Sequence, residues 1–209
     1  MKVALIGATG RTGLPLLETL LDRGHVVSVL VRDPAKLGVP ADRVRVVVGN
    51  ARDELALAQL VEGADAVVSA LGPSDKDKTL HSDVAAGLVG VMTTAGVRRF
   101  VGVSAAGIDV PGDIKSGRDR FVSKLIRIVG GAAAKDKPAE YAVWAASDLD
   151  WTLVRPPRLA KGAATGNVEH HASTSCKKTS ITRADLAAFL VDVVEDSLYV
   201  QQAPFVAGA

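Results

Sequence analysis

The sequence has almost no cysteine and no long apolar run. Cys176 is the only cysteine among 209 residues, so a disulfide cannot form within the chain, which fits a reducing cytoplasm. No stretch approaches the roughly 18 apolar residues that a membrane-spanning helix needs, and Met1 and Lys2 lead directly into a short apolar run without a signal-peptide core. We therefore expect a soluble, cytoplasmic protein.

An excess of charge of either sign is also missing. The 25 basic and 23 acidic side chains leave a formal net charge of +2, which argues against nucleic acid as a partner. With 209 residues, 48% of them hydrophobic, the chain is long enough to bury one good core. We expect a single domain over residues 1–209, without internal repeats.

Short β-branched runs alternate with longer amphipathic segments. The runs are continuous in apolar residues, as is typical of strands covered on both faces; they span residues 2–6, 26–31, 44–48, 65–71, 99–104 and 150–154. The first helices are expected at residues 14–23, 53–62 and 79–95, each followed by a glycine that can end it. Because such units connect by right-handed crossovers, the order predicts a doubly wound, Rossmann-like α/β fold with a parallel sheet.

The regular alternation weakens after Ser104. We expect a long loop at residues 105–117 and a solvated loop at residues 74–78. Prolines and glycines argue against regular structure in residues 155–167, and this segment is expected to form a small C-terminal substrate-pocket region. Two further helices are expected at residues 118–129 and 136–147. The segment 180–196 is expected to contain a helix capped by Thr182, and a last strand follows near residues 204–206.

Three glycines follow the first predicted strand and open the first predicted helix. Gly7 permits a tight exit from the strand, Gly10 lets the backbone come close to a ligand, and Gly13 lets the helix pack near the sheet. Exposed amides at the positive end of a helix favour a pyrophosphate. This context predicts a dinucleotide site, to which we assign Gly7, Thr9, Gly10, Arg11, Thr12 and Gly13.

The end of the second predicted strand distinguishes two forms of the cofactor. About 20 residues past the glycines, NAD-binding folds place an acidic side chain on the ribose, whereas an arginine accommodates the 2′-phosphate of NADP. Arg32 stands at this position, and Arg11 projects from the glycine loop toward the same region. Since a guanidinium binds a phosphate through two parallel hydrogen bonds, we expect NADP(H). Asp33 has a simpler interpretation as an Asx turn or helix cap before Pro34.

A Tyr-x-x-x-Lys pair, in which the lysine lowers the tyrosine pKa for acid–base catalysis, is missing. Tyr141 has Ala145 at the lysine position, and Tyr199 lies near the C-terminus. We interpret Tyr141 as a packing residue and do not expect Tyr199 to reach the cofactor.

Two other groups of residues have structural interpretations. Adjacent His170 and His171 cannot readily aim both rings at one ion, and Cys176 has no second cysteine beside it, so no metal is expected. Trp144 and Trp151 are expected to anchor the core, because one falls in a predicted helix and the other begins a predicted strand.

Segments spread in order over nearly the whole chain carry a family resemblance: ALIGATGRTG, VSVLVRDPAKL, VRVVVGNARD, DAVVSALG, GVRRFVGVSAAG, LDWTLVRPPRL and ITRADLAAFLV. They resemble the NmrA-like group of atypical short-chain dehydrogenases/reductases, and within it the NADPH-dependent flavin reductase/biliverdin reductase B type. The resemblance implies a single Rossmann-like domain that binds NADPH across the strand ends.

The resemblance also implies roles for individual residues. Asn50, with Ala51 beside it, stands where many relatives have an aspartate that contacts adenine, and Ser104 would lie beside the nicotinamide. The residues implied to line the nicotinamide-ribose passage are Ala70, Leu71 and Gly72. Pro156 and Pro157 are implied to contact the carboxamide side of the nicotinamide ring.

Arg158 stands where the flavin/biliverdin reductase pattern has a histidine after the Pro-Pro pair. An arginine is a poor proton donor but binds carboxylates or phosphates well. Arg158 is therefore expected to bind either an anionic substrate or the cofactor. The alternative is that its side chain faces solvent and binds neither.

Hydride transfer to a flavin or quinone needs no acid from the protein, because the acceptor can take its proton from water. We therefore expect an NADPH-dependent reductase of a small aromatic or conjugated molecule, with Ser104 and Arg158 as its substrate-handling residues. Two alternatives remain open: a non-catalytic NADP(H) sensor that binds a partner protein, as the resemblance implies for some NmrA-like members, and an isomerase or epimerase of a specialised metabolite. The sequence does not set the oligomeric state.

Overall fold

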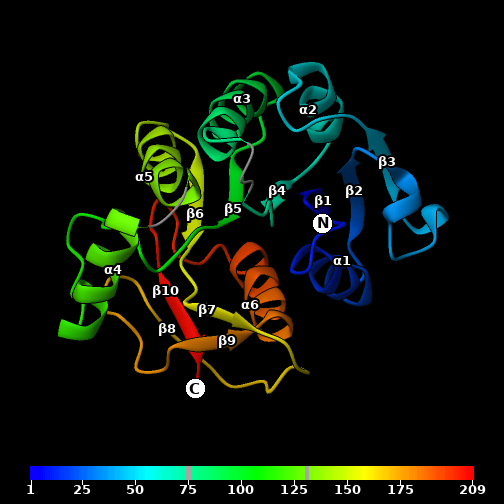
Figure 1. The fold of residues 1–209 in the computed structure, drawn as a ribbon. Coiled ribbons are helices and arrows are strands. Elements are labelled where there is room, and N and C mark those ends of the chain that lie inside the picture. The colour runs from blue at the N-terminus through cyan, green and yellow to red at the C-terminus, as the bar shows by residue number, and fades with distance from the viewer. Residues whose placement is uncertain (74–76, 130–131) are drawn as a thin grey trace.

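A six-stranded parallel sheet forms the centre of the molecule (Figure 1). The computed structural model describes residues 1–73, 77–129 and 132–209, so residues 74–76 of the expected solvated loop lie outside the described residues. The strand order is β3-β2-β1-β4-β5-β6, with the bounds Lys2–Ile6 (β1), Val26–Val31 (β2), Arg45–Val48 (β3), Ala66–Ser69 (β4), Arg99–Val103 (β5) and Asp150–Val154 (β6). The predicted doubly wound fold is confirmed, and its switch point, where such folds bind ligands, lies between β1 and β4.

Helices cover both faces of the sheet (Figure 1). One face carries α1 (Gly13–Asp22) and α6 (Arg183–Glu195), and the other carries α2 (Glu54–Val61), α3 (Leu80–Ala95) and α5 (Ala132–Ala145). Between the sheet strands, two short 3-10 helices, η1 (Pro34–Lys36) and η2 (Ala41–Arg43), join β2 to β3. In the described part of the chain, no helix has the length and apolar character to cross a membrane.

The helix α5 begins earlier than the sequence pattern suggested. It starts at Ala132 rather than at residue 136 and contains Pro138. A proline lacks the amide hydrogen that helices use and is tolerated best in the first turn, which favoured a start close to Pro138. The alanines before it have the highest helix propensity of all residues, so the helix extends toward the N-terminus past the proline.

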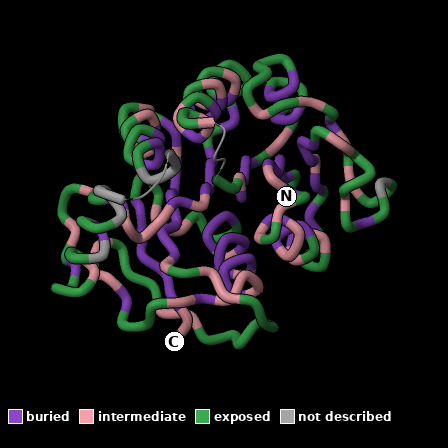
Figure 2. Tube along the Cα trace, viewed as in Figure 1, coloured by how far each residue is buried: buried purple, intermediate pink, exposed green. Residues whose placement is uncertain are grey.

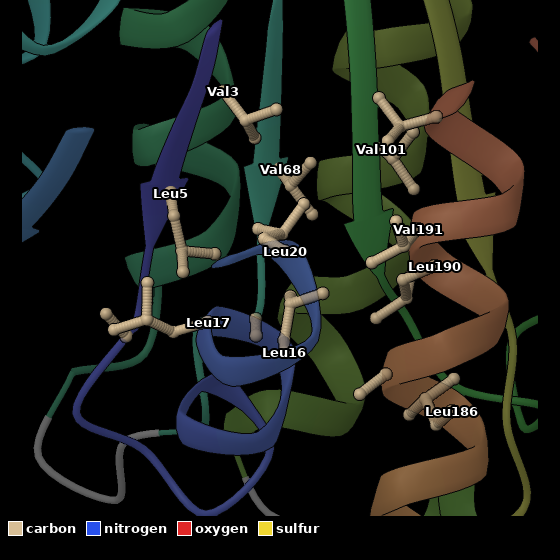
Figure 3. Close-up of a cluster of buried hydrophobic side chains, with 14 of the residues drawn as sticks. Val3, Leu5, Leu16, Leu17, Leu20, Val68, Val101, Leu186, Leu190 and Val191 are labelled. Carbon is tan, nitrogen blue, oxygen red and sulfur yellow. The ribbon is translucent and has the colours of Figure 1, made fainter. Parts of the chain in front are cut away.

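Buried aliphatic side chains hold α1 and α6 on the sheet. Figure 3 shows Leu16, Leu17 and Leu20 of α1 directed toward strand residues such as Leu5 and Val68. These leucines are fully buried, and each contributes roughly 1.5–3 kcal/mol through removal of apolar surface from water. In Figure 2 the same core appears as a buried interior under exposed outer helix faces.

Aromatic side chains pack in the core on the opposite face of the sheet, under α5. Trp144 of α5 stacks on Phe100 of β5 with ring centroids 3.7 Å apart, and Trp151 of β6 meets Tyr141 of α5 edge-on at 5.9 Å. Both tryptophans are buried. The predictions that they anchor the core and that Tyr141 is a packing residue are therefore confirmed.

The C-terminal part adds two small sheets and one helix beside the main sheet (Figure 1). These elements are α4 (Gly117–Val129), β7 (Arg158–Ala160) paired with β9 (Ser180–Thr182), and β8 (Val168–His171) paired with β10 (Phe205–Gly208). The helix over residues 118–129 and the last strand are confirmed, and the Thr182 hydroxyl caps α6 by accepting from the Asp185 amide at 3.0 Å.

The expectation of no regular structure in residues 155–167 is wrong for β7. The strand begins directly after Pro157, so neither proline has to supply an amide to its ladder. Its partner β9 lies about 20 residues further along the chain. A pairing with such a distant segment leaves no local signal in the sequence.

A buried ion pair fixes the long loop that follows β5. Arg155, at the end of β6, is fully buried and donates to the two carboxylate oxygens of Asp113 at 2.7 and 2.6 Å. Its Nε donates to the Ala203 carbonyl oxygen at 2.6 Å, and its guanidinium lies 3.8 Å from the ring centroid of Phe205. The loop is thereby tied to β6 and to the C-terminal segment.

Substitution of Arg155 should destabilise the fold, because the buried Asp113 carboxylate would lose both guanidinium hydrogen bonds and keep only the Lys115 ammonium, 3.8 Å away, as a counterion. We expect Arg155→Met to lower the free energy of unfolding by about 3–5 kcal/mol, measured by urea denaturation. The double variant Arg155→Met with Asp113→Leu should regain most of this loss, since neither charge remains. A single variant within about 1 kcal/mol of the parent protein would show that the pair does not hold the loop.

Candidate functional site

The glycine loop between β1 and α1 is closely packed. Gly7 has a φ of +85°, and a Cβ atom there would lie 2.7 Å from the carbonyl oxygen of Ala70. A Cβ atom at Gly13 would lie 1.9 Å from the carbonyl oxygen of Gly7, while the Gly10 amide closes the turn by donating to that oxygen at 2.9 Å. Only glycine permits this backbone path at Gly7 and Gly13.

This path leaves backbone amides open at the start of α1. Among the described residues, the amides of Arg11, Thr12 and Gly13 have no hydrogen-bond acceptor, and Thr12 makes no side-chain cap. Open amides at the positive end of a helix bind anions such as a pyrophosphate. The loop thus fits the pyrophosphate of a dinucleotide cofactor.

A cavity of about 400 Å³, the first cavity, opens beside this loop at the carboxyl ends of β4 and β5. The predicted residues that line it are Gly10, Arg11, Thr12, Ala70, Leu71, Gly72 and Ser104. Ser104 is only 6% exposed, and its hydroxyl has no partner within the described chain. Because an unpaired buried hydroxyl costs free energy, Ser104 is suited to a hydrogen bond with a bound molecule.

The other predicted cofactor residues lie outside the first cavity. They are Gly7, Thr9 and Gly13 in the glycine loop, Arg32, Asn50 and Ala51 after β2 and β3, and Pro156 and Pro157 after β6. The Asn50 side-chain oxygen accepts from the Arg52 amide at 3.1 Å. This bond closes a local turn, and the role of Asn50 toward adenine stays a prediction.

The two arginines expected to bind the 2′-phosphate have side chains that can still pair with an anion. Arg11 and Arg32 are exposed, and neither forms an ion pair with any described residue. Asp33 instead caps η1, since its carboxylate accepts from the Ala35 amide at 3.1 Å. The simpler interpretation of Asp33 is therefore confirmed, while NADP binding by the two arginines stays a prediction.

A buried group of charged side chains, which the sequence analysis missed, lies between α3 and α5. The Lys137 ammonium donates to the Val103 carbonyl oxygen at 2.8 Å and pairs with Glu140 at 2.7 Å. His81 lies 4.0 Å from Glu140, and Asp136 accepts from the His81 amide at 2.6 Å. Lys137 and His81 also line the first cavity, so this group belongs to the site.

Burial changes the protonation of this group. It lowers the pKa of His81 to about 4, with a further contribution from the positive charge of Lys137. It also raises the pKa of Glu140, a shift that Lys137 opposes. At neutral pH His81 is a neutral imidazole whose Nε2 has no partner among the described residues, beside an ammonium that donates hydrogen bonds.

The available sequence signal for this group was weak. Lys137 and Glu140 stand three residues apart within the predicted helix at 136–147, a spacing that solvent-exposed ion pairs also use. Nothing in that spacing shows that α3 covers the pair, because its burial arises from packing between distant elements.

A second cavity of about 430 Å³ adjoins the first, and both are lined by Ala105 and Gly107. Pro156, Pro157 and Arg158 line this second cavity and not the first. The structure therefore places Arg158 and Ser104, the two predicted substrate-handling residues, in different cavities. None of the glycine-loop residues lines the second cavity.

Tyr199 and the two histidines have other partners. The Tyr199 hydroxyl and His170 Nδ1 are 2.6 Å apart, and His171 Nε2 lies 3.2 Å from Glu169. Neither Tyr199 nor Tyr141 lines the first or the second cavity. This placement agrees with the expectation that no tyrosine serves the cofactor.

Addition of a single methyl group at Gly13 should abolish the anion site. In Gly13→Ala the new Cβ meets the Gly7 carbonyl oxygen, so the loop must move and the open amides with it. We expect the dissociation constant for NADP⁺ to rise at least tenfold, or about 1.4 kcal/mol, measured by isothermal titration calorimetry.

The matched control is Gly90→Ala in α3, where an added Cβ meets nothing within 4 Å. This change should leave binding unchanged and stabilise the fold by about 0.5–1 kcal/mol, because alanine favours the helix. Equal affinity of Gly13→Ala and the parent protein for NADP⁺ would contradict the assignment of the pyrophosphate to the glycine loop.

Comparison with known proteins agrees with this geometry. The sequence model of an NAD(P)H-binding family matches residues 7–197. The uncharacterized sugar epimerase YhfK of Bacillus subtilis (strain 168) is 29% identical over 206 residues, covering 94% of this chain and 89% of that protein. The oxidoreductase ptaF of Pestalotiopsis fici is 25% identical over 213 residues, covering 93% and 79%.

A solved structure shares the fold. ChuY, an anaerobillin reductase from Escherichia coli O157:H7, has a TM-score of 0.82 at 23% identity, with 100% of this chain and 97% of that chain covered. The family match begins at Gly7, the first residue of the glycine loop, and extends into the segment after α6. The chain belongs to the NAD(P)H-binding family, and its cofactor is a nicotinamide dinucleotide.

Proposed function

We propose that the protein is an NADPH-dependent reductase that transfers hydride to a small aromatic or conjugated acceptor, such as a flavin or a quinone. The observation that carries the proposal is the first cavity, where the unpaired Ser104 hydroxyl and the Lys137 ammonium lie beside the open amides of the glycine loop. The relative named as an oxidoreductase supports this reaction class.

The residues proposed to hold the cofactor follow from this arrangement. The amides after Gly10 take the pyrophosphate, and Arg11 and Arg32 take the 2′-phosphate. We propose that Asn50 and Ala51 contact adenine. The residues proposed to contact the nicotinamide half are Ala70, Leu71, Gly72, Ser104, Pro156 and Pro157. When bound, reduced nicotinamide supplies the hydride that such enzymes transfer.

The protein's own groups position the reactants. Ser104 gives a hydrogen bond to a ligand that enters the first cavity. The Lys137 ammonium donates one hydrogen bond to the Val103 carbonyl oxygen and has Glu140 as its counterion at 2.7 Å. An ammonium carries three donors, so Lys137 can also donate to a ligand hydroxyl or carbonyl oxygen. The acceptor takes one hydride and then one proton from water, so no protein acid is consumed.

Loss of the Ser104 hydroxyl should slow this reaction without unfolding the protein. We expect NADPH oxidation with flavin mononucleotide or a simple quinone, and about a tenfold lower kcat/KM for Ser104→Ala, because one positioning hydrogen bond is worth about 1.4 kcal/mol. Ser28→Ala in β2, outside both cavities, is the control. Tight NADP⁺ binding without turnover across a broad acceptor panel would instead support the non-catalytic sensor.

The cofactor preference has a separate test. Arg32→Asp removes a guanidinium and adds a charge that repels the 2′-phosphate, so we expect NADPH affinity to fall by more than about tenfold, or 1.4 kcal/mol, while NADH affinity stays or improves. Lys161→Asp, an exposed charge reversal outside both cavities, should change neither affinity. Equal affinity of the parent protein for NADH and NADPH would overturn the assignment.

A second candidate function rests on one relative. The protein that is 29% identical to this chain carries the name of a sugar epimerase, and an epimerase uses its nicotinamide only transiently. Such an activity would convert its substrate without net loss of NADPH. Product analysis of reactions that contain catalytic amounts of cofactor separates it from the reductase.

A further inference from the structure

The second cavity contains more positive charge than its ion pairs use. Its basic lining residues are Arg118, Arg155, Arg158 and Lys178, and its acidic lining residue is Asp119. Arg155 is neutralised by Asp113, which it holds through two hydrogen bonds. Arg118 lies 3.2 Å from Asp119 and also donates to the Lys177 carbonyl oxygen. Two positive charges, on Arg158 and Lys178, are left over.

These two cations are held close together by the backbone. The first residue of β7 is Arg158, whose amide donates to the Thr179 carbonyl oxygen at 3.3 Å, and Lys178 directly precedes Thr179. The guanidinium of Arg158 has no hydrogen bond or ion pair with any described residue. Lys178 makes one long contact, 3.5 Å from its ammonium to the Ala209 oxygen.

The rest of the lining adds no further negative charge. Burial raises the pKa of the Cys176 thiol to about 12, so the thiol stays neutral at physiological pH. Pro156, Pro157 and Phe205 supply apolar surface. Arg158 and Lys178 are themselves exposed. An anion that enters beside them meets two cations next to a partly apolar wall and can accept charge-assisted hydrogen bonds from both.

The position of the second cavity indicates which molecule brings the anion. It adjoins the first cavity at Ala105 and Gly107, and none of its lining residues belongs to the glycine loop or follows β2. The phosphates of the cofactor are assigned to the glycine loop and to Arg32, which do not line the second cavity. The cofactor is proposed to reach that cavity only with its uncharged carboxamide side, at Pro156 and Pro157, so an anionic group held there belongs to the acceptor.

We propose that Arg158 and Lys178 form a subsite for a phosphate or carboxylate group carried by the acceptor, whose conjugated ring lies in the first cavity. The inference rests on the proposed reductase function and narrows its substrate to anionic acceptors. It assigns Arg158 to substrate binding instead of to the cofactor.

Two flavins that differ only in a phosphate provide the test. Flavin mononucleotide and riboflavin share the ring that is reduced, so their KM values with NADPH are compared for the parent protein, Arg158→Gln, Lys178→Gln and the double variant. We expect a KM for flavin mononucleotide at least tenfold below that for riboflavin. In the double variant this preference should vanish, with riboflavin unaffected. Lys161→Gln removes a nearby charge outside both cavities and should change nothing.

Binding to the NADP⁺-loaded protein, followed by quenching of flavin fluorescence, separates the two proposals. Phosphate-dependent binding that is lost in the double variant, without turnover of either flavin, would refute the reductase and retain the subsite. Equal KM and equal affinity for the two flavins would overturn the subsite and leave the reductase intact. An equal rise in both KM values in the variants, or no saturable binding of either flavin, would also overturn it.

Discussion

The contact between Gly13 and the Gly7 carbonyl oxygen determines where the rest of the site can lie. A Cβ atom at Gly13 would come within 1.9 Å of that oxygen, so the start of α1 approaches the end of β1 only because both residues are glycines. At this junction the amides of Arg11, Thr12 and Gly13 have no hydrogen-bond acceptor among the described residues. A helix end that is open in this way favours an anion, and the first cavity extends from it along the carboxyl ends of β4 and β5.

Two buried ion pairs, Lys137–Glu140 and Arg155–Asp113, stabilise the segments that line the two cavities. Lys137 and Glu140 are paired within a helix that also contributes Trp144 to the core, so the ammonium near the first cavity is held by packed secondary structure. Arg155 links β6 to the loop that separates the two cavities. Both ion pairs cost desolvation free energy, and both fix the position of residues that line a cavity.

The sequence predicted much of the fold and the cofactor end of the site, because these depend on local patterns. Continuous apolar strands, helices that end at glycine and the spacing of Gly7, Gly10 and Gly13 are visible within short windows. The pairing of β7 with β9 and the burial of Lys137 depend on segments that meet only in the folded chain. For the same reason the sequence offers Arg158 as a candidate anion-binding side chain but does not assign it to a second cavity.

Amide chemical shifts give the most direct test of the central claim, that open amides of the glycine loop hold the cofactor pyrophosphate. In a titration of the ¹⁵N-labelled protein with NADP⁺, the account predicts saturable shifts at the amides of Arg11, Thr12 and Gly13, and smaller shifts there with nicotinamide mononucleotide, which lacks the pyrophosphate. Saturable binding that leaves these three amides unshifted, or no binding of any pyridine nucleotide, would contradict it.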